Sequence, residues 1–225
     1  MVDINQNLSS LRQQLQQLAL QFEQAPAKLI AVSKTMPTAA IRAAHAYGQG
    51  AFGENYAHEL AAKAQELAHL KLEWHFIGHI QSNKTKIIAT YASWVHGLCS
   101  LAHALRLNQQ RPEDLAPLKV LIEVKLSNDN DKQGLTSYDE ILLLATKLVK
   151  LPRLELCGLM GMATADSELA HGQFKQLQTY LQQLNNHGFK LKHLSMGMSQ
   201  DYPQALACGA TMLRIGSKIF GPRST

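Results

Sequence analysis

Cysteine is scarce in this chain, which has 225 residues and only three cysteines, at positions 99, 157 and 208. They lie far apart and form no CxxC pair, an arrangement that argues against a disulfide framework and is typical of a reducing compartment. Long apolar runs are also absent, since no stretch approaches the ~20 apolar residues of a membrane span. The polar first ten residues lack the apolar core of a signal peptide. We therefore expect a cytoplasmic protein with no membrane partner.

Aromatic residues are few, at 6% of the chain, and the lysines and arginines form no run despite a net charge of +5. A scattered basic excess is typical of a solvated surface or a site for an anionic ligand, and not of a nucleic-acid footprint. His75 and His79 have the four-residue spacing of a zinc pair, but they fall on a predicted strand and loop without the accompanying glutamate. The sequence therefore predicts neither a nucleic-acid partner nor a metal site.

An alternation of short apolar stretches and amphipathic stretches runs through the chain. Leu8, Leu11, Leu15, Leu18 and Phe22 recur at helical spacing, which predicts a helix within residues 1–25 that packs outside the fold. The strands predicted after it span residues 29–34, 51–54, 72–78, 94–99, 118–126, 154–162, 191–196 and 211–215. The helices predicted between and after them span residues 38–47, 56–69, 82–91, 101–110, 137–149, 167–186 and 202–208, with a short helix from residue 217.

Eight strands, each followed by a helix, predict a single closed (β/α)₈ TIM barrel formed by residues 1–225. A doubly wound open sheet is the alternative. Such a sheet usually has fewer strands and a GxGxxG turn after the first one, and this chain has no such turn. We therefore expect an α/β barrel of one domain with an extra N-terminal helix.

Lys34 stands at the carboxyl end of the first predicted strand, where α/β folds place their chemistry. A lysine is costly to bury unless it is paired or used covalently, and a deprotonated lysine amine forms Schiff bases with aldehydes. The alternative is a lysine whose stem is covered while its amine reaches solvent. Lys34 is therefore the first candidate for covalent chemistry.

A second group of candidates follows the last two predicted strands. Ser199 precedes the helix over residues 202–208, and Gly216 and Ser217 open the final helix. Glycine permits close approach of the backbone, serine supplies a hydroxyl and a helix N-terminus supplies free amides, so this group predicts a phosphate site. The alternative is that both serines only cap helices. A lysine opposite a phosphate site suits pyridoxal 5′-phosphate (PLP), an aldehyde that carries a phosphate.

Other strand ends contribute further candidates. Arg214 shares a strand face with Gly216 and is placed to reach the pyridine nitrogen of PLP, which a guanidinium would keep unprotonated. Asn55 follows the second strand, Met160 lies in the sixth and His79 follows the third. We expect Asn55 and Met160 to contact the cofactor, whereas the role of His79 stays open.

Several short motifs occur in a fixed order along most of the chain. They are AVSKT (31–35), FGEN (52–55), EWHFIG (73–78), QSNK (81–84), GLM (158–160), GMS-x-D (197–201), RIG (214–216) and IFG (219–221). Together they resemble the YggS/PROSC family of pyridoxal phosphate homeostasis proteins over residues 28–221. The resemblance implies a fold-type III PLP barrel, similar to the N-terminal domain of alanine racemase without the racemase's second domain.

The same resemblance implies roles for individual residues. It implies a Schiff base between PLP and Lys34, with Arg214 facing the pyridine nitrogen and Asn55 near the cofactor. The phosphate ligands that it implies are Ser199, Gly216 and Ser217. Ser217 stands where threonine is frequent and keeps the hydroxyl, and His79 stands where an apolar residue is common.

The residues leave more than one function open. The first is intracellular PLP homeostasis, in which the protein holds PLP without efficient catalysis and meets PLP-dependent apoenzymes. The second is an amino-acid racemase of the alanine racemase fold type. The third is a sugar-phosphate enzyme that uses Lys34 for an aldol-type reaction, but paired carboxylates for it are few apart from Glu54. Racemisation needs acid/base groups on both faces of a carbon, and the racemases take one from their second domain. We therefore expect no catalytic residues and no efficient racemase or transaminase activity. We also expect the protein to be a monomer.

Overall fold

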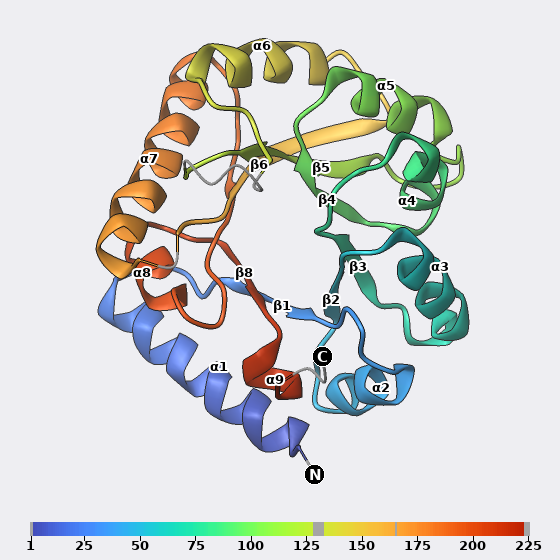
Figure 1. The fold of residues 1–225 in the computed structure, drawn as a ribbon, viewed down its shortest axis with the longest axis vertical. Coiled ribbons are helices and arrows are strands. Elements are labelled where there is room, and N and C mark those ends of the chain that lie inside the picture. Colours follow the sequence, from blue (N-terminus) through green and yellow to red (C-terminus); the bar gives the residue numbers. More distant parts are fainter. Residues whose placement is uncertain (1, 128–132, 165, 223–225) are drawn as a thin grey trace.

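Eight parallel strands close into a barrel within residues 2–127, 133–164 and 166–222, which the computed structural model describes (Figure 1). The strands pair in sequence order, and β8 pairs with β1 to complete the ring. Their bounds are β1 Lys28–Val32, β2 Ala51–Glu54, β3 Glu73–Phe76, β4 Trp94–Leu98, β5 Leu118–Val124, β6 Leu154–Gly161, β7 His193–Ser195 and β8 Met212–Ile215. The predicted closed barrel is confirmed, and the open-sheet alternative is excluded.

Helices surround the barrel on its outer side (Figure 1). They are α1 Ile4–Gln21, α2 Thr38–Ala46, α3 Ala57–Glu66, α4 Thr85–Tyr91, α5 Leu101–Gln110, α6 Tyr138–Leu148, α7 Ser167–Asn186, α8 Tyr202–Ala207 and α9 Ser217–Phe220, with 3₁₀ turns η1 Ala68–Leu70 and η2 Ser82–Lys84. Each helix in the described part of the chain is too short or too polar to cross a lipid bilayer.

The extra helix α1 lies outside the ring, as predicted, and packs against α2, α8 and α9. The side chain of Asp3 accepts a hydrogen bond from the amide of Gln6 and so caps its first turn. Leu8 and Leu11 are buried on its inner face. The helix spans Ile4–Gln21 and so lies within the predicted range of residues 1–25.

Two apolar layers hold the fold together. One lies between the strands and the helices and includes Phe52, Leu159 and Phe174. A smaller cluster fills the inside of the barrel and includes Ile30 and Met160. Strands that are buried on both faces explain why the sequence shows continuous apolar runs and little alternation.

An irregularity in β6 changes which of its side chains point inward. The register between β5 and β6 shifts after Val120, so that Leu121 pairs with Gly158 and Cys157 is passed over. As a result Cys157 and Met160, three positions apart, both belong to the inner cluster. A regular strand would place residues three apart on opposite faces.

Candidate functional site

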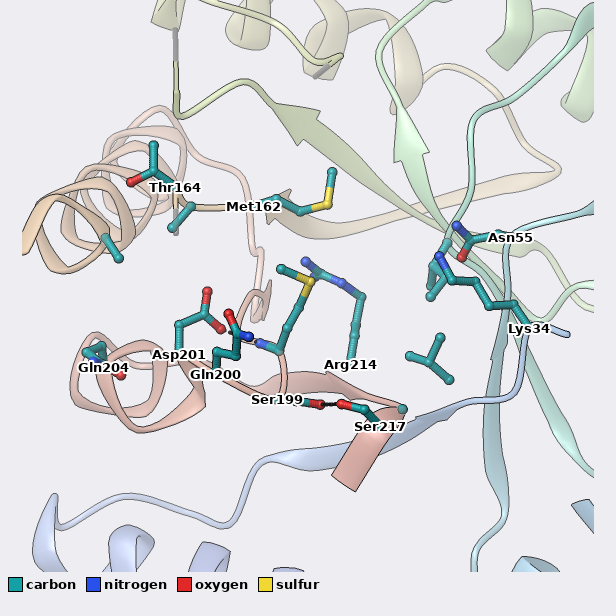
Figure 2. A pocket seen from close by; sticks show the side chains of 16 residues that line it. Lys34, Asn55, Met162, Thr164, Ser199, Gln200, Asp201, Gln204, Arg214 and Ser217 are labelled. Carbon is teal, nitrogen blue, oxygen red and sulfur yellow. Dashed lines mark hydrogen bonds between the residues drawn. The ribbon is translucent and has the colours of Figure 1, made fainter. Parts of the chain in front are cut away.

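A cavity of about 460 Å³ opens at the carboxyl ends of the strands (Figure 2). Residues from the loops after β1, β2, β6, β7 and β8 line it. Parallel barrels direct every strand end to this one face, which brings residues far apart in sequence together. The lining residues that the sequence singled out are Lys34, Asn55, Ser199, Arg214, Gly216 and Ser217.

Lys34 lies two residues beyond the end of β1 and reaches into the cavity from one side (Figure 2). The next residue, Thr35, has a φ of 64°, a left-handed conformation that is uncommon for a β-branched residue. The amide of Thr35 donates a 2.8 Å hydrogen bond to Glu59. Glu59 in turn accepts a 2.7 Å bond from Lys63. The turn that carries Lys34 is therefore fastened to α3.

A buried ionic cluster lies beside the end of β1. The amine of Lys63 donates to Glu54 at 2.9 Å and to the carbonyl of Ser33 at 2.8 Å. The hydroxyl of Ser33 donates to the same Glu54 oxygen at 2.6 Å. Burial raises the pKa of Glu54, and Lys63 and Ser33 oppose that rise. Glu54 is fully buried, so its carboxylate takes part in fixing β1 and β2 and does not reach the cavity.

Asn55 follows β2 directly and shares the side of the cavity that holds Lys34 (Figure 2). Gly78 packs against its backbone so closely that a Cβ on residue 78 would lie 2.0 Å from the carbonyl oxygen of Asn55. Only glycine permits that approach. The glycine after β3 therefore helps to set the position of Asn55.

Ser199 and Ser217 meet on the opposite side of the cavity. The hydroxyl of Ser217 donates a 2.9 Å hydrogen bond to the hydroxyl of Ser199 (Figure 2). Gly197 has a φ of 90°, and a Cβ there would lie 2.7 Å from that of Ala205, so the turn that presents Ser199 requires glycine.

The two serines differ in their relation to the helices. The first residue of α9 is Ser217, after Gly216, as predicted. Ser199 does not cap the helix over residues 202–208, the alternative role considered for it, because Asp201 is the capping position of α8 and no side chain caps it. The Ser199 hydroxyl pairs with Ser217 because the loops after β7 and β8 converge.

Arg214 lines the cavity from β8, and Figure 2 shows its side chain in the centre of the view. Its Nη1 donates to Ser195 at 2.6 Å and its Nη2 donates to the carbonyl of Gly161 at 3.0 Å. Burial lowers the pKa of Arg214 to about 10, against the opposing charges of Glu123 and Asp201. The guanidinium is therefore charged at neutral pH and fixed in direction.

Glu123, on β5, is a buried acid whose negative charge acts on Arg214 and raises the pKa of the guanidinium. Burial raises its pKa to about 7, although the charge of Arg214 lowers it in part. A carboxyl group with such a pKa changes charge close to neutral pH. Sequence reasoning did not single out Glu123, because a glutamate within an apolar strand is visible only as one polar residue in LKVLIEVKL.

Two of the sequence candidates lie away from the cavity. Met160 points into the barrel interior and does not line the cavity, whereas Met162, two residues nearer the carboxyl end, does. His79 is exposed and its ring lies 3.4 Å from the side-chain nitrogen of Gln133. Asp201, which the sequence analysis did not select, lines the cavity and accepts a 2.6 Å bond from the amide of Met198.

The lining suits a ligand with an aldehyde and an anionic group. An amine stands on one side, two hydroxyls joined by a hydrogen bond stand on another, and a guanidinium held by hydrogen bonds lines the same cavity. Hydroxyls beside a helix start are typical ligands of phosphate. PLP has these features, so the residues fit it. Within the described residues no group of three or more histidine, cysteine, aspartate or glutamate side chains is placed to hold a metal ion.

Comparison with known sequences matches the alanine racemase N-terminal domain family over residues 6–224. A pyridoxal phosphate homeostasis protein of Pseudomonas aeruginosa is 44% identical, over 99% of this chain and 97% of that protein. A protein of the same name from Escherichia coli K12 is 42% identical, over 99% of this chain and 98% of that protein.

Solved structures agree with this relationship. PipY of Synechococcus elongatus PCC7942, with PLP bound, is 37% identical, with a TM-score of 0.86 over 97% of this chain and 100% of that chain. Alanine racemase of Corynebacterium glutamicum is 21% identical, with a TM-score of 0.70 over 98% of this chain and 60% of the racemase. The second likeness shows a shared barrel and no more.

Proposed function

The chain belongs to the alanine racemase N-terminal domain family and, within it, to the pyridoxal phosphate homeostasis proteins, and from this premise we propose that it binds PLP and serves intracellular PLP homeostasis. The observation that carries the proposal is the placement of Lys34 across one cavity from the Ser199–Ser217 pair, with Arg214 lining the same cavity. The structure of PipY with PLP bound supports the same ligand for a related barrel.

When bound, PLP supplies an aldehyde that a lysine amine takes up as a Schiff base, and a phosphate that anchors it. Lys34 is the residue for the covalent bond, because it is the lysine of the cavity lining. The hydroxyls of Ser199 and Ser217, with the backbone of Gly216, hold the phosphate.

The ring is held by residues on other loops. Arg214 presents a charged donor to the pyridine nitrogen, and a group that keeps its own proton leaves that nitrogen unprotonated. Asn55 lies beside Lys34 and orients the ring, and Met162 covers it. Met160 does not line the cavity and belongs to the inner cluster against which Met162 packs.

The homeostasis proposal includes several properties of the protein as a whole. The protein holds PLP in the cytoplasm as a monomer and supplies it to PLP-dependent apoenzymes. The named relatives support the homeostasis role. In the described part of the chain the cavity lining has only Asp201 as a titratable side chain besides Lys34 and Arg214, which favours holding PLP over the racemase alternative.

Titration of the apoprotein with PLP tests the proposal. We expect a new visible absorbance band that saturates at one PLP per chain and that is absent from a Lys34→Ala variant. Saturable binding without a visible band, or no binding at all, would refute it. A sugar-phosphate enzyme would give no visible band with PLP.

A further inference from the structure

A row of buried polar side chains crosses the inside of the barrel and ends at Arg214. It begins at Glu73, the first residue of β3, and continues through His75 on β3, His96 on β4 and Ser195 on β7. Glu73 lies 2.6 Å from His75, His75 lies 2.9 Å from His96, and His96 lies 2.8 Å from Ser195. Arg214 closes the row with its 2.6 Å bond to Ser195. We call these five residues the relay.

The middle of the relay is sealed from solvent. His75, His96 and Ser195 are fully buried, whereas the Glu73 side chain is 34% exposed at the end of the barrel opposite the cavity. Polar groups are costly to bury without hydrogen-bond partners, so these three depend on one another. The ring of His75 also stacks on Trp94, at 5.7 Å between centroids, which restricts its rotation.

The chemistry of the two ends dictates where every proton lies. A guanidinium has no acceptor, so Ser195 accepts from Arg214 and donates its own proton to Nδ1 of His96. An ionised carboxylate has no proton to give, so Nε2 of His75 donates to Glu73. The shared bond then runs from Nε2 of His96 to Nδ1 of His75. The carboxylate end fixes this order for neutral rings, and the order gives the Ser195 proton an acceptor in Nδ1 of His96.

The charge states agree with this order. Burial lowers the pKa of His75 and lowers that of His96 well below the usual value. The cations Lys28 and Lys119 add to the effect on His75, and only Glu73 opposes it. Both rings are therefore neutral, and each carries one proton.

Further charged groups act on the two ends of the row. For His96, the charges of Arg214 and Lys28 add to the effect of burial. Burial raises the pKa of Glu73, but the hydrogen bonds from His75 and Lys28 and the charge of Lys28 lower it overall, so Glu73 is ionised.

We propose that the relay is a positioning device, in which Glu73, His75, His96 and Ser195 hold the guanidinium of Arg214 in one orientation toward the ligand cavity. The relay is not a path for proton delivery, because its cavity end is a guanidinium that keeps its proton. The Arg214 guanidinium donates one hydrogen bond to Ser195 and one to the carbonyl of Gly161. These two bonds together fix the orientation of the guanidinium plane. That this orientation serves the ring of PLP rests on the proposed function, whereas the relay itself is a property of the cofactor-free chain.

Nitrogen NMR of the cofactor-free protein tests the relay directly. With ¹⁵N-labelled histidine and arginine, assigned through their backbone signals, we expect His75 and His96 each to carry the proton on Nε2. A proton on Nδ1 of either ring, or a second proton on either ring at pH 7, would overturn the proposal. Because PLP is not present, this result is independent of whether the protein binds PLP.

Variants test whether the far end acts on Arg214. In Ser195→Ala we expect hydrogen exchange of the Arg214 guanidinium to accelerate at least about tenfold, equivalent to about 1.4 kcal/mol. Glu73→Gln, which removes the charge of the far end, is expected to change the Arg214 signals. Glu155→Gln removes an exposed acid of β6 that is not in the relay and is the matched control. Equal effects of Glu73→Gln and Glu155→Gln on the Arg214 signals would overturn the proposal. If Glu73→Gln does not fold, the positions of the ring protons of His75 and His96 in the wild-type protein decide the question.

Discussion

The hydroxyl of Ser217 donates a 2.9 Å hydrogen bond to the hydroxyl of Ser199, and this bond joins the loops after β7 and β8. Each hydroxyl retains capacity for a further bond, since a serine has one donor and two acceptor positions. Two such groups side by side on the cavity wall match an anion with several oxygens. The pair therefore gives the phosphate proposal its sharpest test.

Loss of both hydroxyls should weaken PLP retention. For Ser199→Ala combined with Ser217→Ala we expect a higher dissociation constant, because each hydrogen bond to a charged phosphate is worth about 1.5–3 kcal/mol. Equilibrium dialysis measures the change. Pyridoxal, which has no phosphate, is the control ligand, and its affinity should stay the same in the variant. An equal loss for PLP and pyridoxal would place the phosphate elsewhere.

Reduction with borohydride should fix PLP to Lys34. Among the described residues, Lys34 is the lysine that lines the cavity. Peptide mapping of the reduced protein should therefore find the adduct on Lys34. Lys34→Ala should yield no specific adduct. Lys84→Ala, a lysine of η2 outside the cavity lining, is the matched control and should be labelled as the wild type is. An adduct on another lysine in both variants would identify a different attachment site.

Glu123 should make stability depend on pH near neutrality. Its pKa is raised to about 7 in the folded protein from an ordinary value of 4.5. The folded state therefore binds this proton more tightly than the unfolded state. The stabilisation is complete below pH 4.5 and is lost as the pH rises through about 7, a difference of about 3 kcal/mol.

Urea unfolding of a Glu123→Gln variant measures this effect. The variant lacks the ionisation, so its free energy of unfolding should rise relative to the wild type by about 3 kcal/mol between pH 4.5 and 8. Glu155→Gln should instead keep a constant difference from the wild type. A constant difference for Glu123→Gln as well would show that Glu123 does not change charge in this range.

The Lys63–Glu54 pair should stabilise the strand ends strongly. Lys63→Met leaves the fully buried Glu54 without its cation, and removal of one partner of a buried pair costs about 3–5 kcal/mol. The double variant Glu54→Gln and Lys63→Met should recover part of that loss, since it removes the unpaired charge. Denaturant unfolding of the three proteins gives the comparison. A single variant as stable as the wild type would mean that the pair contributes little.

The holoprotein should exchange amino-acid α-protons slowly. The cavity lining, within the described residues, offers Asp201 as the one acid/base side chain besides Lys34 and Arg214, and a missing acid/base group costs about 10²–10⁴-fold in rate. Incubation with L- and D-alanine in deuterium oxide, followed by NMR, measures the exchange. Turnover at about 1 s⁻¹ or faster would favour the racemase alternative. Its loss in Asp201→Asn would then identify the second group.

The barrel and much of the cavity could be predicted from the amino-acid sequence. Alternation of apolar strands with amphipathic helices is a local pattern, and eight such units close in only a few ways. Lys34, Asn55, Arg214 and Ser217 could be placed because each follows or ends a strand, and strand ends of a parallel barrel share one face. Position along the chain was enough for them.

Which side chains meet depends on how distant segments pair in the folded barrel. The register shift at Cys157 directs both Met160 and Met162 to the inside of the barrel. Met162 lies just beyond the carboxyl end of β6 and lines the cavity. The partner of Ser199 is Ser217, and not the amides of the nearby helix. His96 bonds to Ser195, 99 residues away, because closure brings β4 and β7 to the same interior. Such contacts depend on the register between strands, which is set by hydrogen bonds among distant segments and leaves no local pattern in the sequence.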